Sequence, residues 1–471
     1  MFERKLHSAG LIALLVGLLP ATVYSVDVGF EGLVFLEASD NVETVNNPDE
    51  EEGTTAGVVL GAFGEHRSRI VKAGFSGEID TRRIISDEDD SLDTITSFLG
   101  AAEFSLTPRS WRWYIGDILG GVRTDNAIQT FDENDLVRRN VFVTGPSFEY
   151  DVVGVSRTRA RLLYVNQTEE DEELETLYTA NFSHERETTP GSYFGFSLGN
   201  IFTDFSEGSD LVSDTQDPDF NRSTASVFWN RLSGFVELFG RMGITRIDTD
   251  EESLNGLNAE LRAIRRLGPL TSFTVALTRD LNDQTLSTIE SLIESGTDAI
   301  GVTPEAPGFF SETRLSLGYS FQSSQVTADI NAGVAQQDYQ LLTTDSGLGL
   351  SANGEDQVQV FASGSLTRRL SNRLLGQFAI SYERQDFDNR VDETDSVLAS
   401  AQLIYSLSTS FDLEASVIHD TSQGVLTRFG GTVGVAEDVD ITENRVTIGV
   451  RWAPPTRASQ DLTVELKSLL Q

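Results

Sequence analysis

Alternation of apolar and polar residues is the dominant pattern of this chain, and residues 357–387 show it most clearly. From Leu374 onward, apolar or small residues occupy every second position and polar residues fill the places between them. Only an extended strand puts two such sets on opposite faces. Because the residues before the polar turn Arg368–Asn372 alternate in the same way, the sequence predicts a hairpin. The apolar set expected on one face is Leu374, Gly376, Phe378, Ile380 and Tyr382.

The same hairpin recurs along the chain. The first strand is expected near Val28–Ala38 and the last at Arg445–Trp452, with strands of about ten to thirteen residues, the length of a tilted strand in a bilayer. The pattern predicts about 20 strands, within a range of about 18 to 22. A barrel with both ends in the periplasm needs an even number of strands. Gly424–Val435 is therefore assigned to the last outer loop or to a strand extension. Among the connections between strands, Leu281–Pro307 alone has a helical pattern, at Leu286–Ser295.

These features predict an all-β fold: a transmembrane antiparallel up-and-down β-barrel with short periplasmic turns and long acidic outer loops. A soluble propeller or solenoid is the alternative, but propeller blades use short strands with recurrent motifs. In lipid every backbone group must be paired, which requires closure. Aromatic residues at strand ends, such as Trp111, Trp113 and Tyr114, fit interface girdles, although ordinary packing is the other explanation.

The two ends of the chain have a different character. Arg4 and Lys5 precede the apolar run Ala9–Leu19, so residues 1–25 are expected to be a signal peptide cut after Ser25. A membrane anchor is the alternative, but it needs about 20 apolar residues. Residues 26–453 are assigned to the barrel. Residues 454–471 form a periplasmic tail whose leucine spacing indicates a short amphipathic helix or a frayed end.

Composition supports export to the cell outer membrane. The net charge of −38 becomes −39 once Glu3, Arg4 and Lys5 leave, and the chain has no cysteine. Such acidity argues against a nucleic-acid partner, because phosphates bind basic surfaces. The expected partners are instead outer-membrane lipid and lipopolysaccharide, together with the barrel-insertion machinery.

Few residues suggest chemistry. The histidines that remain, His66, His184 and His419, are isolated in sequence, so we expect no catalytic residue, no cofactor and no metal site. A barrel lipase would need a histidine and a serine paired on the outer wall. Asp117 falls in the same alternate set as Trp111 and Trp113, so either a bulge near Gly116 changes its face or the residue lies beyond the apolar band.

Other charged residues divide between loops and wall. The acidic segments Asn47–Glu52, Asp87–Asp90 and Glu169–Glu175 are expected to be solvated loops, with Ca²⁺ or Mg²⁺ binding as the alternative. Residues of both signs are expected on the inner wall, which predicts a polar lumen without clear ion selectivity. They are Lys72, Glu78, Glu103, Arg314, Asp329, Glu383 and Glu414.

Several segments resemble a family of porin-like outer-membrane barrels associated with bacterial exopolysaccharide and PEP-CTERM/exosortase systems. The similar segments are GLVFLEASDNV (Gly32–Val42), LTPRSWRWYIGD (Leu106–Asp117), NVFVTGPSFEY (Asn140–Tyr150) and LTRRLSNRLLGQFAISYERQDF (Leu366–Phe387). The resemblance implies an outer-membrane location and polysaccharide export components as partners, and it supplies no catalytic residues. One departure is that the chain continues past Trp452, whereas many outer-membrane proteins end on an aromatic residue.

The sequence therefore predicts a non-enzymatic outer-membrane barrel that serves as a channel or assembly component in the export of exopolysaccharide or surface proteins. A general diffusion porin and a non-conducting structural or adhesive barrel are the alternatives.

Overall fold

The computed structural model describes most of the chain from Val26 onward. The described residues are 26–41, 52–85, 90–107, 110–123, 136–153, 155–169, 172–205, 219–249, 253–283, 301–302, 309–340, 356–387, 393–429 and 434–453. Within them the protein consists of strands and short turns, without a helix. Accordingly, no helix in these ranges is long and apolar enough to cross a membrane.

In the described part of the chain, twenty long strands and one short strand make up the sheet. Their bounds are β1 (Val26–Ser39), β2 (Gly53–Arg67), β3 (Val71–Ile85), β4 (Asp90–Ser105), β5 (Trp111–Arg123), β6 (Leu136–Val152), β7 (Ser156–Glu169), β8 (Glu172–Thr189), β9 (Ser192–Phe205), β10 (Phe220–Leu232), β11 (Val236–Thr249), β12 (Ser253–Gly268), β13 (Thr271–Asp283), β14 (Gly301–Val302), β15 (Phe309–Gln322), β16 (Val326–Gln340), β17 (Gln357–Arg369), β18 (Leu374–Phe387), β19 (Glu393–Ser406), β20 (Phe411–Phe429) and β21 (Gly434–Trp452).

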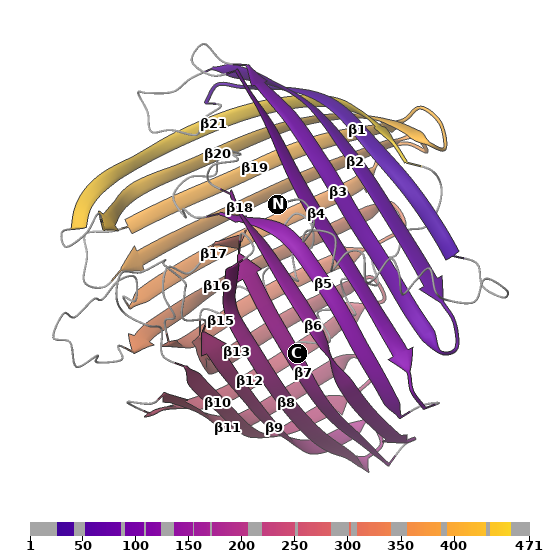
Figure 1. Ribbon diagram of the computed structural model, residues 1–471, viewed down its shortest axis with the longest axis vertical. Coiled ribbons are helices and arrows are strands. Elements are labelled where there is room, and N and C mark those ends of the chain that lie inside the picture. Colours follow the sequence, from indigo (N-terminus) through magenta and orange to yellow (C-terminus); the bar gives the residue numbers. More distant parts are fainter. Residues whose placement is uncertain are drawn as a thin grey trace.

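The long strands close into a ring. Each pairs in antiparallel fashion with the long strand that follows it, and β1 pairs with β21 over Gly32–Ser39. Among the described residues, closure gives every long strand a partner on both sides, as the hydrocarbon core of a membrane requires. The expected barrel of 20 antiparallel strands is thus confirmed. Figure 1 shows β1 to β9, in indigo to magenta, as one wall and the orange and yellow strands as the wall behind it.

The two faces of the wall differ as the alternation predicts. Directly paired residues lie on the same face, so Phe378 shares its face with Leu366 and Val417 through the pairings of β17 to β20. These three side chains are 42–51% exposed. The opposite face is concave, because its side chains reach across an intervening strand, as Arg82 of β3 does to Phe35 of β1. The apolar set of β18 therefore points outward, away from the lumen.

Five of the described short turns at one end share a sequence feature. Ser68, Ser233, Ser323, Ser371 and Ser408 each begin a turn in which the serine N–H donates to the carbonyl three residues later. In three turns the serine hydroxyl also donates to that carbonyl, at 2.9–3.0 Å. Because β1 begins and β21 ends at this end, we call it the short-turn end and the opposite end the long-loop end.

Strand length differs from the expectation. The long strands have 13 to 19 residues, and in the two longest, β20 and β21, the extra residues lie at the long-loop end. Most of the acidic segment Glu169–Glu175 is strand, since β7 ends at Glu169 and β8 begins at Glu172. Likewise, β20 extends to Phe429 and β21 begins at Gly434, so most of Gly424–Val435 is strand extension and the last strand starts well before Arg445.

Several expectations concern residues outside the described ranges. These are the signal peptide 1–25, the tail from 454 to 471, the helical segment Leu286–Ser295, residues 47–51 of the first acidic loop and residues 87–89 of the second. They remain predictions.

Candidate functional site

The lumen wall is the candidate site, because it carries most of the polar side chains that contact one another. All seven charged residues expected to face inward belong to the inward set in the cross-strand register, which confirms the prediction of a polar lumen with both signs of charge. They are Lys72, Glu78, Glu103, Arg314, Asp329, Glu383 and Glu414.

One ionic network crosses five strands near the short-turn end. Glu103 on β4 lies 3.4 Å from Lys72 on β3 and 3.6 Å from Arg112 on β5. Arg112 continues to Glu149 on β6 at 3.5 Å, and Arg159 on β7 contacts Glu149 at 3.5 Å. Each carboxylate therefore has at least two basic neighbours. Networks of this kind hold side chains in fixed positions more effectively than isolated surface pairs.

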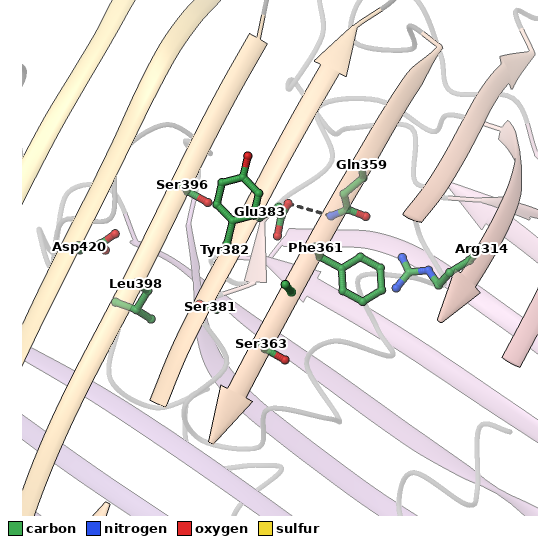
Figure 2. A pocket seen from close by; sticks show the side chains of 11 residues that line it. Arg314, Gln359, Phe361, Ser363, Ser381, Tyr382, Glu383, Ser396, Leu398 and Asp420 are labelled. Carbon is green, nitrogen blue, oxygen red and sulfur yellow. Dashed lines mark hydrogen bonds between the residues drawn. The ribbon is translucent and has the colours of Figure 1, made fainter. Parts of the chain in front are cut away.

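A recess of about 400 Å³ lies in the wall formed by β15 to β20. Figure 2 shows its lining, in which Gln359 Nε2 donates to Glu383 Oε1 at 2.8 Å. The hydroxyls of Ser363, Ser381 and Ser396 line the same recess. The recess thus combines amide, carboxylate and hydroxyl groups, which can donate and accept several hydrogen bonds at once.

An aromatic ring lies at the edge of this recess beside a guanidinium group. Arg314 Cζ lies 5.3 Å from the centre of the Phe361 ring, within the range of a cation–π contact. Glu312, two residues before Arg314, binds the guanidinium at 3.0 Å. The ring packs over Gly333 of the intervening strand, where a Cβ would lie 2.5 Å from Phe361 Cζ. Glycine is therefore what allows the ring to lie against the wall.

The same arrangement occurs a second time, on β1 to β3. Arg82 Cζ lies 5.3 Å from the centre of the Phe35 ring, and Asp80 binds the guanidinium at 2.7 Å. Gly57 of the intervening strand lies beneath the ring, and a Cβ there would be 2.2 Å from Phe35 Cζ. Neither unit was predicted from the sequence. The available signal was a shared acid–Thr–Arg run, at 80–82 and 312–314.

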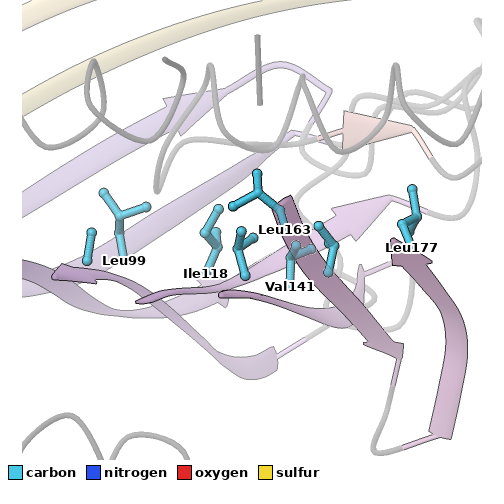
Figure 3. Close-up of a cluster of buried hydrophobic side chains, with 8 residues drawn as sticks. Leu99, Ile118, Val141, Leu163 and Leu177 are labelled. Atoms are coloured by element: carbon cyan, nitrogen blue, oxygen red, sulfur yellow. The ribbon is translucent and has the colours of Figure 1, made fainter. Parts of the chain in front are cut away.

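Part of the lumen wall is apolar, which the sequence analysis did not predict. A cluster of aliphatic side chains on β4 to β8 faces inward and is only 1–9% exposed (Figure 3). We call it the apolar lumen patch: Leu99, Ala101, Ile118, Val141, Val143, Leu163, Val165 and Leu177. A usable signal was the run Val141–Val143, where both faces of one strand are apolar.

Asp117 was expected either to change face through a bulge near Gly116 or to lie beyond the apolar band, and it does neither. The pairing of β5 with β4 and β6 is regular throughout, so no bulge moves Asp117 to the lumen. It lies at the middle of β5, on the outward face between Gly100 and Phe142, and is 3% exposed. Asn140 hydrogen-bonds to its carboxylate, yet Asp117 Oδ1 and Asn140 Oδ1 both have no donor.

The histidines are far apart and all belong to the outward set, on β2, β8 and β20. His184 Nδ1 lies 2.9 Å from the Thr158 hydroxyl, and His419 Nδ1 lies 2.8 Å from Asn444 Oδ1. Neither contact is the histidine–serine pair that a barrel lipase needs. Within the described ranges, no three histidine or acidic side chains are grouped as metal ligands.

Known structures resemble this barrel in fold. The FrpB iron transporter of Neisseria meningitidis superposes with a TM-score of 0.50 at 10% identity, covering 91% of this chain and 81% of that one. The siderophore receptor PirA of Acinetobacter baumannii gives a TM-score of 0.50 at 9% identity, with 90% and 80% covered. At such identity the similarity concerns the fold alone. No family model and no curated protein matches the sequence.

These observations define the class of the protein. A closed barrel of 20 antiparallel strands with an apolar outer face is the architecture of outer-membrane transporters and porins. The protein is an outer-membrane β-barrel.

Proposed function

We propose that this barrel is a non-enzymatic channel through which a polar, polyhydroxylated cargo crosses the outer membrane, as a component of exopolysaccharide or surface-protein export. The observation that carries the proposal is the lumen wall, where charged, amide and hydroxyl groups recur on strands all around the ring. A hydrated passage requires such a wall.

The recess at β15 to β20 favours a saccharide among polar cargoes. Sugar hydroxyls both donate and accept, and Gln359, Glu383 and the three serines offer both kinds of group. The Phe361 ring, which also contacts the Arg314 guanidinium, adds apolar surface to the lining beside these polar groups. The link to export rests on the family resemblance of the hairpin segments, and the short turns would face the periplasm.

Conductance of the purified protein in a planar lipid bilayer tests the proposal. We expect a persistent current that neutral oligosaccharides interrupt. Phe361→Ala should weaken this block about five- to tenfold, which corresponds to roughly 1–1.4 kcal/mol of binding free energy. Phe378→Ala is the matched control, because Phe378 lies on the outward face, and it should leave the block unchanged.

Other outcomes would favour the alternatives. A current that saccharides do not interrupt indicates a general diffusion porin. Absence of current indicates a structural or adhesive barrel. A strain that lacks the gene and still exports its extracellular polysaccharide normally would contradict the export role, whatever the conductance.

A further inference from the structure

The hairpin of β13 and β15 leaves the barrel wall at the long-loop end. Pairing between β12 and β13 stops at Ala259 and Arg279, although β12 continues to Ser253 beside β11. Beyond that point β13 still pairs with β15 as far as Asp283 and Phe309. The two strands therefore continue together without their neighbour.

Contacts of the hairpin end show where it goes. Arg222 Nη2 on β10 donates to the Leu281 carbonyl at 2.8 Å, and Thr245 on β11 donates to Asp280 at 3.2 Å. Leu281 lies over the inner face of Gly256 on β12. A Cβ added to Gly256 would lie 2.6 Å from the Cβ of Leu281. Leu281 and Phe309 are buried with Phe220 of β10. The hairpin end thus bends inward across three strands and reaches β10.

The connection between the two strands is then held on a distant part of the ring. Gly301 and Val302, which form β14, pair in parallel with Val122 and Arg123 at the long-loop end of β5. The chain must therefore run from the inner side of β10 to β5. Along the wall, β6 to β9 lie between these points, and the apolar lumen patch occupies β4 to β8.

Burial of the patch requires atoms in front of it. Val141, Val143 and Val165 are each 1% exposed, although their side chains point into the lumen. Neighbouring strands cover the flanks of an inward side chain but not its tip, because the opposite wall of a 20-strand barrel is distant. An apolar wall without cover would also be unfavourable in a water-filled lumen.

We propose that the apolar lumen patch is the docking surface for residues 284–300 of the same chain. The segment supplies a matching face, because Leu286, Ile289, Leu292 and Ile293 recur at helical spacing. Its length also fits the five strand spacings that separate β10 from β5, about 24 Å along the wall. At about 1.5 Å per residue a helix over these residues spans roughly 25 Å. Residues 303–308, which return from β14 to Phe309, reach about 25 Å when extended.

Pairs of engineered cysteines test the proposal cleanly, because the chain has no cysteine of its own. Leu292→Cys combined with Val143→Cys should form an intramolecular disulfide in the full-length protein, seen as a mobility shift on a non-reducing gel. Leu292→Cys with Ser381→Cys is the matched control, since Ser381 faces the lumen on β18. We expect the first pair to oxidise at least tenfold faster than the control pair.

Another occupant of the patch would give a different result. Ile128→Cys in the β5–β6 connection and Leu466→Cys in the tail, each combined with Val143→Cys, report on those segments. If either pair oxidises faster than the Leu292 pair, the assignment is wrong. Ile289→Cys with Leu163→Cys provides a second pair in case the first variant does not fold. The proposal is overturned if neither pair from 284–300 oxidises faster than the control in folded protein.

Discussion

Single residues in this barrel are constrained chiefly by what lies directly across the strand from them. Asp117 and Asn140 share the outward face of β5 and β6, where each has an oxygen without a donor. Two acceptors that face no donor cost free energy in a buried position. A carboxylate on the lipid-facing wall adds a further cost.

Replacing one of these acceptors by a donor should therefore stabilise the barrel. Asp117→Asn removes the charge and supplies an N–H group that can donate to Asn140 Oδ1. We expect the free energy of unfolding to rise by about 1–2 kcal/mol, measured by urea titration of the protein in lipid vesicles. Asp329→Asn, on the lumen face, is the control and should change stability by less than about 0.5 kcal/mol. Destabilisation by Asp117→Asn would contradict this account of the pair.

Gly57 permits a close contact with the Phe35 ring. Gly57→Ala places a methyl group where the ring now lies, so the ring must move away from the wall and lose its position beneath Arg82. We expect a cost of about 1–3 kcal/mol, the usual effect of overpacking, in the same urea titration. Gly120→Ala is the matched change on β5, because nothing lies within 4 Å of a Cβ there. Equal effects of the two substitutions would show that the glycine is not needed for the ring.

At the scale of elements, the sequence predicted most of the hairpins because successive residues of a strand point to opposite faces, so the face of a residue follows from its position along the strand. The alternation at Leu374–Tyr382 therefore identified the outward face without knowledge of any contact. The limits of the strands were harder to predict. Acidic residues such as Glu169 and Glu172 look like loop residues, yet where strands extend beyond the bilayer, water surrounds both faces and polarity no longer separates strand from loop.

The contents of the lumen were also beyond the sequence. Val141 and Val143 alternate with Phe142, so no polar face marks the inner side of β6. Whether an apolar inward residue meets water or another chain segment depends on connections far away in sequence, such as that between β13 and β15. Likewise, the contact of Arg314 with Phe361 joins strands separated by β16, and the acid–Thr–Arg run gives no indication of its aromatic partner.

The serine turns offer a test at the scale of the hairpin. In the β10–β11 turn, Ser233 Oγ donates to the Val236 carbonyl at 2.9 Å and accepts from the Val236 N–H at 3.2 Å. Ser233→Ala should lower the free energy of unfolding by about 0.5–1.5 kcal/mol, the net value of such hydrogen bonds. Ser324→Ala changes an exposed serine inside the β15–β16 turn and should have a smaller effect. If both variants matched the unmodified protein in urea titration, the serine hydroxyl would not be what holds the turn.

For the whole molecule, the assignment to the membrane depends on which side of the wall is apolar, and two adjacent residues of β18 separate the possibilities. Ile380 points outward and is 44% exposed, whereas Ala379 shares the lumen face with Ser365 and Ser400. A lysine on the lipid face costs about 2–4 kcal/mol at the middle of the bilayer, while a lumen position keeps the ammonium group in water. Ile380→Lys should therefore lower the free energy of unfolding by about that amount and reduce the yield of folded barrel in membranes, whereas Ala379→Lys should cost less than about 1 kcal/mol.

Because both substitutions introduce the same side chain into the same strand, effects of strand propensity or total charge cancel in the comparison. The reverse order, with Ala379→Lys the more damaging variant, would mean that the barrel presents its polar face to lipid, which is incompatible with an outer-membrane protein.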